Sequence, residues 1–347
     1  MLQPFVIKDY IVMSINWEEL GFGYMPVRSN IRFTYENGKW SDGRLCNNYD
    51  ITMNVAANCL HYGQALFEGG KAFTTADGRV CVFRPDENAR RMNSTARHLV
   101  MPEFPEDKFV EAVRTVVKDN IDFVPPYGTG GALYIRPVMF GVSPQIGVKA
   151  SEKYEFVIMV VPVGAYYRGG IKPVRAMIPE NLDRAAPHGT GHIKAAGNYA
   201  ASLLPSKLAH EKDCSVALFL DPKEHKYVDE FGTSNFIGIT KGGVYVTPES
   251  PSILPSITNK SLMQVAKDLG IKTERRPITV EELADLAEVG ACGTAVVLTP
   301  VKEILYGEKT FKYSEEIGPV LKKLYDHMTG IQHGTVPDIH NWLFEVK

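Results

Sequence analysis

The pattern of apolar and polar positions predicts alternating strands and helices in the first half of the chain. Residues 80–83 form a short apolar run that predicts a strand, and the next stretch carries apolar side chains on one helical stripe up to residue 98. Asp86 is a residue type that favours the N-cap, so we expect this helix to begin there. Residues 107–120 repeat apolar positions at helical spacing, which is typical of a helix lying on a sheet.

Two longer apolar runs predict central strands. Residues 133–140 and 156–163 are rich in β-branched side chains and are bounded by glycine and proline. Such near-continuous apolar runs are typical of strands that are buried on both faces.

Short strands and helices also alternate in the second half. The helix expected over residues 256–269 ends before a glycine, which suits a C-terminal cap. Thr279 and Glu282 have the spacing of a capping box, so we expect a further helix that stops before Gly290. A last helix follows Ser314. The predicted strands are residues 174–178, 216–220, 236–240, 244–247 and 295–299.

The length of the chain and a shift in its composition predict two domains. The 347 residues are about twice the usual size of a domain. Residues 164–173 are rich in Gly, Tyr, Arg and Pro, unlike the apolar run before them. We therefore expect an α/β fold with a first domain over residues 1–163, a linker over residues 164–173 and a second domain over residues 174–347.

Composition and charge narrow the class of partner. The formal net charge is -2, from 38 Lys and Arg residues against 40 Asp and Glu residues. This balance gives no general field that would attract nucleic acid or an acidic membrane, so we expect small-molecule partners. No apolar stretch approaches the roughly 20 residues of a membrane-spanning helix. The N-terminal region lacks the pattern of a cleaved leader, and we expect a cytoplasmic protein.

Several motifs that often carry chemistry are incomplete in this chain. The five cysteines are widely spaced and form no C-x-x-C, which favours reduced thiols over disulfides or a zinc site. His188 and His192 are four apart, but the glycines between them disfavour a helix, and we expect no metal site. No Gly-rich stretch completes a dinucleotide or ATP motif, and G-x-S-x-G is absent.

One lysine, Lys194, stands among small residues in the segment G-H-I-K-A-A-G-N-Y. A flat ligand can approach such an amine closely, and shielding from water lowers the pKa of an amine toward nucleophilic use. A solvated surface charge is the commoner role for any single lysine. Lys194 is therefore a candidate nucleophile only in combination with the other motifs.

Further polar side chains lie at turns, at a helix start and on a strand. Glu230 precedes a glycine turn that enters a strand. The helix over residues 256–269 begins with Ser and Thr, where free N–H groups can bind an anion or simply be capped. The small residues 290–295 form a turn whose amides can meet a carboxylate or phosphate. Arg91 lies on a predicted helix and Arg136 on a predicted central strand, where a buried guanidinium requires an anion.

The order and type of these motifs resemble the branched-chain-amino-acid aminotransferases, pyridoxal-phosphate enzymes of fold type IV. The resemblance runs from H-Y-G-Q-A-L-F-E-G at residues 61–69 through T-A-V-V-L-T-P-V at residues 294–301, nearly the whole chain. It implies a smaller N-terminal α/β domain, a larger C-terminal pseudo-barrel domain and a cofactor in the cleft between them. It also implies a homodimer with shared active sites, in some members assembled further.

The resemblance implies which residues hold pyridoxal 5′-phosphate. Lys194 would form the Schiff base, Tyr199 would hydrogen-bond the 3-oxygen, and Glu230 would face the pyridine nitrogen. The groups matched to the phosphate are the guanidinium of Arg91, the backbone amides of Ile257 and Thr258, and the hydroxyl of Thr294.

The α-carboxylate and the aliphatic side chain of the substrate also have matching residues. Tyr134 and the turn amides of Thr294 and Ala295 resemble the groups that bind the α-carboxylate. Phe67 resembles a wall of the aliphatic pocket.

A second set of matches concerns glutamate and the neighbouring subunit. Tyr62 and Arg136 match the groups that receive the side-chain carboxylate of glutamate. Ile146 and Val148, with Tyr62, would reach or border the site of the neighbouring subunit.

The implied activity is reversible ping-pong transfer of an amino group from leucine, isoleucine or valine to 2-oxoglutarate, giving glutamate and a branched 2-oxo acid. A D-amino-acid transaminase or an aminodeoxychorismate lyase of the same fold, and a catalytically idle vitamin-B6-binding protein, are the alternatives. An assay of leucine with 2-oxoglutarate separates them. The C-x-x-C pair that mammalian members carry is absent, so a thiol switch is not implied.

Overall fold

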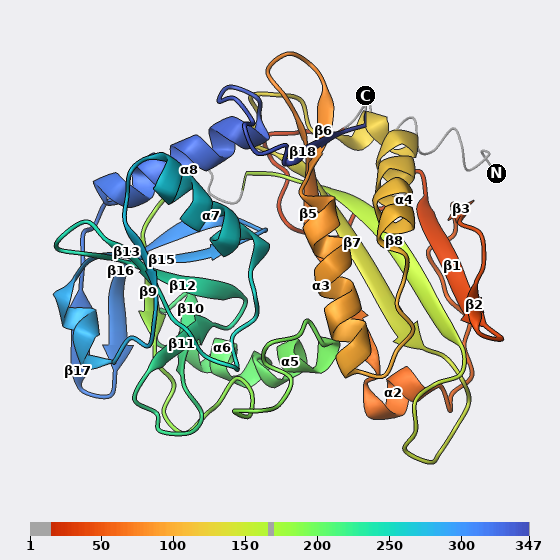
Figure 1. The fold of residues 1–347 in the computed structure, drawn as a ribbon, viewed down its shortest axis with the longest axis horizontal. Helices are drawn as coiled ribbons and strands as arrows, with labels where there is room; N and C mark the ends of the chain where they lie inside the picture. Colours follow the sequence, from red (N-terminus) through yellow and green to blue (C-terminus); the bar gives the residue numbers. More distant parts are fainter. Residues whose placement is uncertain (1–14, 166–169, 347) are drawn as a thin grey trace. The chain divides into compact units, whose positions relative to one another are not determined.

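The computed structural model describes residues 15–165 and 170–346 and divides the chain into two compact units. Unit 1 comprises Met1–Tyr166 and Gly330–Lys347, and unit 2 comprises Tyr167–Thr329 (Figure 1). Part of the expected linker, residues 166–169, lies outside the described residues.

The last residues of the chain belong to a different unit from the one that we expected. Residues 330–347 lie in unit 1, whereas the predicted second domain extended to residue 347. The physical reason is β18 (Leu343–Glu345), which pairs antiparallel with β6 (Val80–Phe83) and extends the first sheet. With these residues included, the N-terminal unit is the longer of the two rather than the smaller.

Unit 1 is an antiparallel sheet with helices on one face. Its other elements are β1 (Asn30–Glu36), β2 (Lys39–Trp40), β3 (Arg44–Cys46), α2 (Asn58–Tyr62), β4 (Ala65–Phe67), β5 (Gly70–Thr74), α3 (Pro85–His98), α4 (Glu106–Asp119), η1 (Ile121–Phe123), β7 (Ala132–Gly141) and β8 (Tyr154–Val163). The strand order is β18-β6-β5-β7-β8-β1-β2, with β3 paired to β1 and β4 to β7. Helices α3 and α4 pack against each other and against the sheet, and they enclose the first core (Figure 1).

The elements predicted for unit 1 are confirmed, with several boundaries shifted by one or two residues. Strands β7 and β8 pair with each other along their whole length near the centre of the sheet. Helix α3 begins at Pro85 rather than Asp86, with Arg84 at the N-cap in a left-handed conformation. Proline suits the first helical position because its φ is already fixed and it has no N–H to leave unpaired.

Strand β7 presents two of the predicted site residues on one face of the sheet. Its side chains alternate between the two faces, as they do in any strand. Leu133 and Ile135 point into the core beneath the helices, whereas Tyr134 and Arg136 are half-buried on the opposite face.

Unit 2 is built around a closed barrel. Its elements are β9 (Val174–Met177), α5 (Ala196–Ala201), α6 (Leu203–Glu211), β10 (Val216–Leu220), β11 (Val228–Phe231), β12 (Ser234–Thr240), β13 (Tyr245–Thr247), α7 (Ile257–Asp268), β14 (Thr273–Arg275), η2 (Glu281–Asp285), β15 (Leu286–Gly293), β16 (Val297–Tyr306), β17 (Lys309–Lys312) and α8 (Pro319–Gln332), whose last residues belong to unit 1. The strands β11-β10-β9-β16-β15-β12 are neighbours in this order, and β11 also pairs with β12. This second pairing closes the ring and confirms the expected barrel.

One predicted helix of unit 2 is instead a short 3₁₀ helix followed by a strand. The backbone N–H of Glu282 donates to Thr279 Oγ1 at 3.3 Å, as in a capping box, but only the short 3₁₀ helix η2 follows. Strand β15 then takes the chain through Gly290, paired with β12 on one side and β16 on the other. Pairing and burial on both sides outweigh the local helix signal.

Candidate active site

The predicted site residues fall into one group in each unit. Unit 1 holds Tyr62, Phe67, Arg91, Tyr134 and Arg136, and unit 2 holds Lys194, Tyr199, Glu230, Ile257, Thr258, Thr294 and Ala295.

Lys194 lies in the loop before α5, where its amine meets the hydroxyl of Tyr199. The amine Nζ donates to Tyr199 Oη at 2.8 Å and lies 5.1 Å from the centre of that ring. The loop packs closely on another segment, because a Cβ at Gly191 would collide with the backbone carbonyl of Ser252. The half-buried amine therefore has a defined direction.

Glu230 lies on β11 and is buried, with its carboxylate held by one ion pair and two hydrogen bonds. Oε1 pairs with Arg184 Nη2 at 2.5 Å and accepts from the backbone N–H of Leu254 at 2.8 Å, and Oε2 accepts from Asn235 Nδ2 at 2.8 Å. Burial raises the pKa of Glu230 to about 7, and the charge of Arg184 opposes this rise. The acid is thus poised near neutrality.

Arg184 joins three segments of unit 2, and the sequence analysis did not identify it. Besides Glu230, its Nη2 donates to the carbonyl oxygens of Gly191 and Ser252, both at 2.6 Å. The arginine thereby links the lysine loop with the segment that leads into α7. The available sequence signal was a charged residue directly before Ala-Ala-Pro, which is too common to single out.

The start of α7 offers two buried N–H groups. Ser256 is the N-cap, and its Oγ accepts from the backbone N–H of Asn259 at 3.2 Å, which confirms the predicted helix start. The structure gives the N–H groups of Ile257 and Thr258 no acceptor among the described residues, and both residues are buried. Free N–H groups at a helix N-terminus form a natural site for an anion such as phosphate.

Thr294 and Ala295 lie in the turn between β15 and β16, beside the turn that follows Glu230. A Cβ at Gly293 would lie 3.5 Å from Ser234 Cβ, which places the two turns in contact. The predicted strand at residues 295–299 therefore starts later, at Val297. Val297 has a φ of 63°, a conformation that costs a β-branched residue on the order of 1–3 kcal/mol and that is concentrated at functional turns.

In unit 1, Arg136 lies among aromatic rings. Its Nη2 donates to Tyr134 Oη at 2.8 Å, and Cζ lies 4.7 Å from the ring centre of Phe67 and 5.1 Å from that of Tyr134. Its Nε is buried without a hydrogen-bond partner in the described structure. None of the ion pairs among the described residues includes Arg136, so these three predicted residues form a cluster with unbalanced positive charge.

Tyr62 lies at the end of α2 and contacts the segment that contains Ile146 and Val148. The hydroxyl of Tyr62 donates to the backbone carbonyl of Ile146. Ile146 and Val148 are 73% and 84% exposed, which is unusual for large apolar side chains.

Arg91 is tightly bound to a residue that the sequence analysis gave no role. Its Nε and Nη2 donate to Glu68 Oε1 and Oε2 at 2.8 and 2.7 Å, and Asn88 Nδ2 donates to Oε2 at 2.7 Å. Glu68 is completely buried. An acidic residue after the apolar run A-L-F was the available signal.

The comparison with protein families decides the family. The model of the amino-transferase class IV family matches residues 65–304. The chain belongs to the class IV aminotransferases. A branched-chain-amino-acid aminotransferase of Helicobacter pylori (strain J99) is 44% identical over 337 residues, which cover 96% of this chain and 98% of that protein. The enzyme of the same name from Haemophilus influenzae is 43% identical over 343 residues, covering 96% and 99%.

A solved structure agrees with the fold of this class IV aminotransferase. The branched-chain amino acid aminotransferase of Escherichia coli has a TM-score of 0.76 and 28% identity. The match covers 91% of this chain and 99% of that chain. Together with the relatives, it confirms the family and the fold that the sequence motifs predicted.

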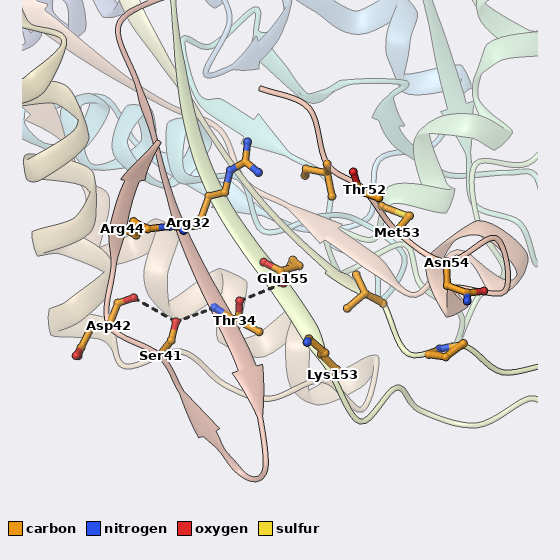
Figure 2. A pocket seen from close by; sticks show the side chains of 13 residues that line it. Arg32, Thr34, Ser41, Asp42, Arg44, Thr52, Met53, Asn54, Lys153 and Glu155 are labelled. Carbon is orange, nitrogen blue, oxygen red and sulfur yellow. Dashed lines mark hydrogen bonds between the residues drawn. The ribbon is translucent and has the colours of Figure 1, made fainter. Parts of the chain in front are cut away.

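The class IV aminotransferase also has a hollow on unit 1 that contains none of the predicted residues. Its volume is about 650 Å³ (Figure 2). Thr34 Oγ1 donates to Glu155 Oε1 at 3.1 Å within it, and Lys153 on its lining pairs with Glu36. Arg32 and Arg44 add positive charge and Asp42 adds negative charge. The lining is mixed in charge and favours no single class of ligand.

Cysteines and histidines of the described segments show no metal-binding arrangement. All five cysteines are free thiols. Within residues 15–165 and 170–346, no group of three or more His, Cys, Asp or Glu side chains is placed to hold a metal ion. In the same residues, no helix is long and apolar enough to cross a membrane.

Proposed function

We propose that this class IV aminotransferase transfers the amino group of leucine, isoleucine or valine to 2-oxoglutarate, with pyridoxal 5′-phosphate as its cofactor. The observation that carries the proposal is the lysine amine of Lys194, half-buried and held 2.8 Å from the hydroxyl of Tyr199. The relatives at 44% and 43% identity, which bear the name of this activity, support it.

The groups of unit 2 fit the chemical parts of this cofactor. A directed amine suits its aldehyde carbon, a buried acid suits its pyridine nitrogen, and the N–H groups that begin α7 suit its phosphate. We assign its binding to Lys194, Tyr199, Glu230, Ile257, Thr258, Thr294 and, from unit 1, Arg91.

The protein's own groups then move and hold protons. When bound, pyridoxal 5′-phosphate supplies a ring that accepts the electron pair left behind when the α-proton departs. Lys194 Nζ takes that proton from the α-carbon of the amino acid, as a general base. Tyr199 fixes the direction of Nζ, and an ionised Glu230 keeps a proton on the pyridine nitrogen.

The substrate must present either an aliphatic side chain or a carboxylate to the same pocket. We assign the aliphatic wall to Phe67 and the side-chain carboxylate of glutamate to Arg136 and Tyr62. The guanidinium against an aromatic ring suits both demands, because it offers N–H donors at its edge and an apolar face beside the ring. The α-carboxylate is assigned to Tyr134 and to the amides of Thr294 and Ala295.

Borohydride reduction and peptide mapping test the role of Lys194. Reduction fixes the cofactor to the lysine that holds it, so we expect the label on Lys194 and none in Lys194→Ala. Lys226 is a matched control, because its Nζ lies 5.3 Å from the ring centre of Tyr227 in an exposed position. Lys226→Ala should retain the label. A label on another lysine, or none, would contradict the assignment.

The substrate assignment is tested by assaying each amino acid with 2-oxoglutarate. We expect turnover with L-leucine, L-isoleucine and L-valine. Turnover of D-amino acids instead would indicate the D-amino-acid transaminase, and elimination from aminodeoxychorismate would indicate the lyase. Binding of the cofactor without turnover of any of these would indicate an idle vitamin-B6-binding protein.

A homodimer is the proposed working form. The exposed apolar side chains of Ile146, Val148 and, at 60%, Leu60 gather near Tyr62, and such patches favour protein–protein contact. Sedimentation of the wild type and of Val148→Asp tests this, with a dimer expected for the first and a weakened dimer for the second. A cytoplasmic location stays a prediction.

A further inference from the structure

The two oxygens of Glu230 differ in what surrounds them. An ionised carboxylate has about four lone-pair positions, shared equally by its oxygens. Oε1 accepts from the N–H of Leu254 and lies 2.5 Å from the guanidinium nitrogen Nη2 of Arg184, whereas among the described residues Oε2 accepts from Asn235 alone. Oε2 is therefore the oxygen with an acceptor position open to a ligand. A proton on Oε2 would compete there with the N–H of a pyridine ring.

The orientation of this carboxylate depends on Arg184. The guanidinium is buried and is anchored by the carbonyls of Gly191 and Ser252, which belong to segments far apart in the chain. With Oε1 bound to this fixed group, Oε2 is the oxygen left for a ligand. Arg184 thus ties the direction of Glu230 to the loop that carries Lys194.

The charges that face Glu230 act in opposite directions. Asp229, its neighbour on β11, is buried, and its Oδ2 accepts from Ser252 Oγ at 2.5 Å. From the other elements, β12 contributes the neutral amide of Asn235, β15 contributes the buried thiol of Cys292, and the loop before α5 contributes Arg184. Arg184 is therefore the cation in this set, and Asp229 is the competing anion.

We propose that Arg184 is a positioning residue that keeps Glu230 ionised with Oε2 available to the pyridine nitrogen, and that Asp229 opposes it. The inference rests on the proposed function, because it concerns the nitrogen of that cofactor. Arg184 acts through Glu230 and touches neither substrate nor cofactor in this scheme.

The opposite signs follow from the charges. Burial is the largest of the effects that together raise the pKa of Glu230 to about 7; among the others, the charge of Arg184 lowers this pKa and the charge of Asp229 raises it. Removal of an opposite charge at this distance raises a carboxyl pKa by about 1–3 units, whereas removal of a like charge lowers it. A residue that only supports the fold would produce no such opposition.

The test measures the affinity of the apoprotein for pyridoxamine 5′-phosphate between pH 5 and pH 9, by fluorescence titration. The proteins are the wild type, Arg184→Gln, Arg184→Lys and Asp229→Asn. The ionisable groups of pyridoxamine 5′-phosphate also titrate in this range, but they do so equally with all four proteins. The test therefore compares the midpoints of the variants with that of the wild type. Circular dichroism checks that each variant is folded.

We expect affinity to fall as the pH drops through the titration of Glu230. In Arg184→Gln the midpoint should move up by at least about 1 unit, so that affinity near neutral pH falls at least about fivefold. In Asp229→Asn the midpoint should move down, and in Arg184→Lys it should stay near that of the wild type. If Arg184→Gln does not fold, the other two variants still test the proposal, because the midpoint should fall in Asp229→Asn and should not move in Arg184→Lys.

Two other outcomes are distinguishable. If the wild type binds with a clear midpoint but Arg184→Gln and Asp229→Asn leave it in place, or lower affinity equally at every pH, the proposal for Arg184 is overturned. If the wild type does not bind pyridoxamine 5′-phosphate at any pH, the proposed function itself fails.

Discussion

Arg136 in unit 1 and Arg184 in unit 2 meet the same physical problem in different ways. Arg184 lies 2.5 Å from a buried carboxylate and also donates to two backbone carbonyls. Arg136 has a tyrosine hydroxyl and two aromatic rings, with no carboxylate paired to it in the described parts of the chain. Unit 2 thus supplies a carboxylate for Arg184 from its own residues. In unit 1, the aromatic cluster around Arg136 leaves the position of the carboxylate to a ligand.

The difference separates guanidinium groups whose charge is balanced within the fold from one whose charge is not. A buried charge is costly unless it is paired and hydrogen-bonded. The pair of Arg91 with Glu68 solves this within unit 1 itself. Arg136 lies in the same unit without such a partner, which is why we assign to it the carboxylate of the dicarboxylic substrate.

The largest effect that the comparison predicts is on stability, from Glu68→Ala. This change leaves Arg91 without its buried partner, so we expect the free energy of unfolding to fall by about 3–5 kcal/mol in urea titrations. The matched control is Glu103→Ala, which removes an exposed pair with Arg97 and should cost about 0–1 kcal/mol. Equal losses in the two variants would contradict the distinction.

The next effect concerns the pH dependence of stability. The pKa of Glu230 is raised from 4.5 to about 7 in the fold by burial, so the folded state favours the protonated acid. The contribution of Glu230 to the free energy of unfolding is present below pH 4.5 and is lost as the pH rises through about 7. Relative to Glu230→Gln, the apoprotein should lose up to about 3 kcal/mol over this interval. Unfolding curves whose difference is independent of pH would contradict this.

Arg136→Met tests whether the guanidinium of unit 1 that has no carboxylate partner binds a carboxylate of the substrate. A charge-assisted hydrogen bond is worth roughly 1.5–3 kcal/mol, so the half-reaction with glutamate should slow about 10- to 150-fold. The half-reaction with leucine, followed in single turnovers by absorbance, should change only a few-fold. Stability should change little, because no ion pair is broken. A joint fall of both half-reactions and of stability would instead indicate a structural arginine.

The smallest expected effect is that of mild peroxide. Cys292 is fully buried, and burial strongly raises the pKa of its thiol, so the reactive thiolate is scarce. We expect no inactivation that dithiothreitol reverses. Recovery of activity on reduction, together with a mapped disulfide, would show a thiol switch that the chain's missing C-x-x-C does not suggest.

Local signals predicted most elements of the fold, and contacts between distant segments account for the errors. Ser256 caps α7 as expected, because capping depends on neighbours in the sequence. A helix was expected between Thr279 and Gly290, but from Leu286 onward the chain forms β15, whose pairing with β12 and β16 decides the structure. Pairing of β18 with β6 likewise joins residues that are far apart in the chain.

The same reasoning explains which site residues the sequence indicated. Lys194 and Glu230 lie in short motifs that can be recognised as such. Arg184 has no motif of its own, because its role appears only when it reaches Ser252, 68 positions further along the chain. Glu68 is likewise explained only by Arg91, 23 positions away.

The place of β18 has a consequence for the synthesis of the protein. Unit 2 lies in the chain between the two segments of unit 1, so every strand of the barrel leaves the ribosome before β18. The barrel can close from its own residues while β6 still has an unpaired edge. An open strand edge invites pairing with other chains. A nascent chain that stalls after the barrel would therefore present an aggregation-prone edge that β18 covers in the finished protein.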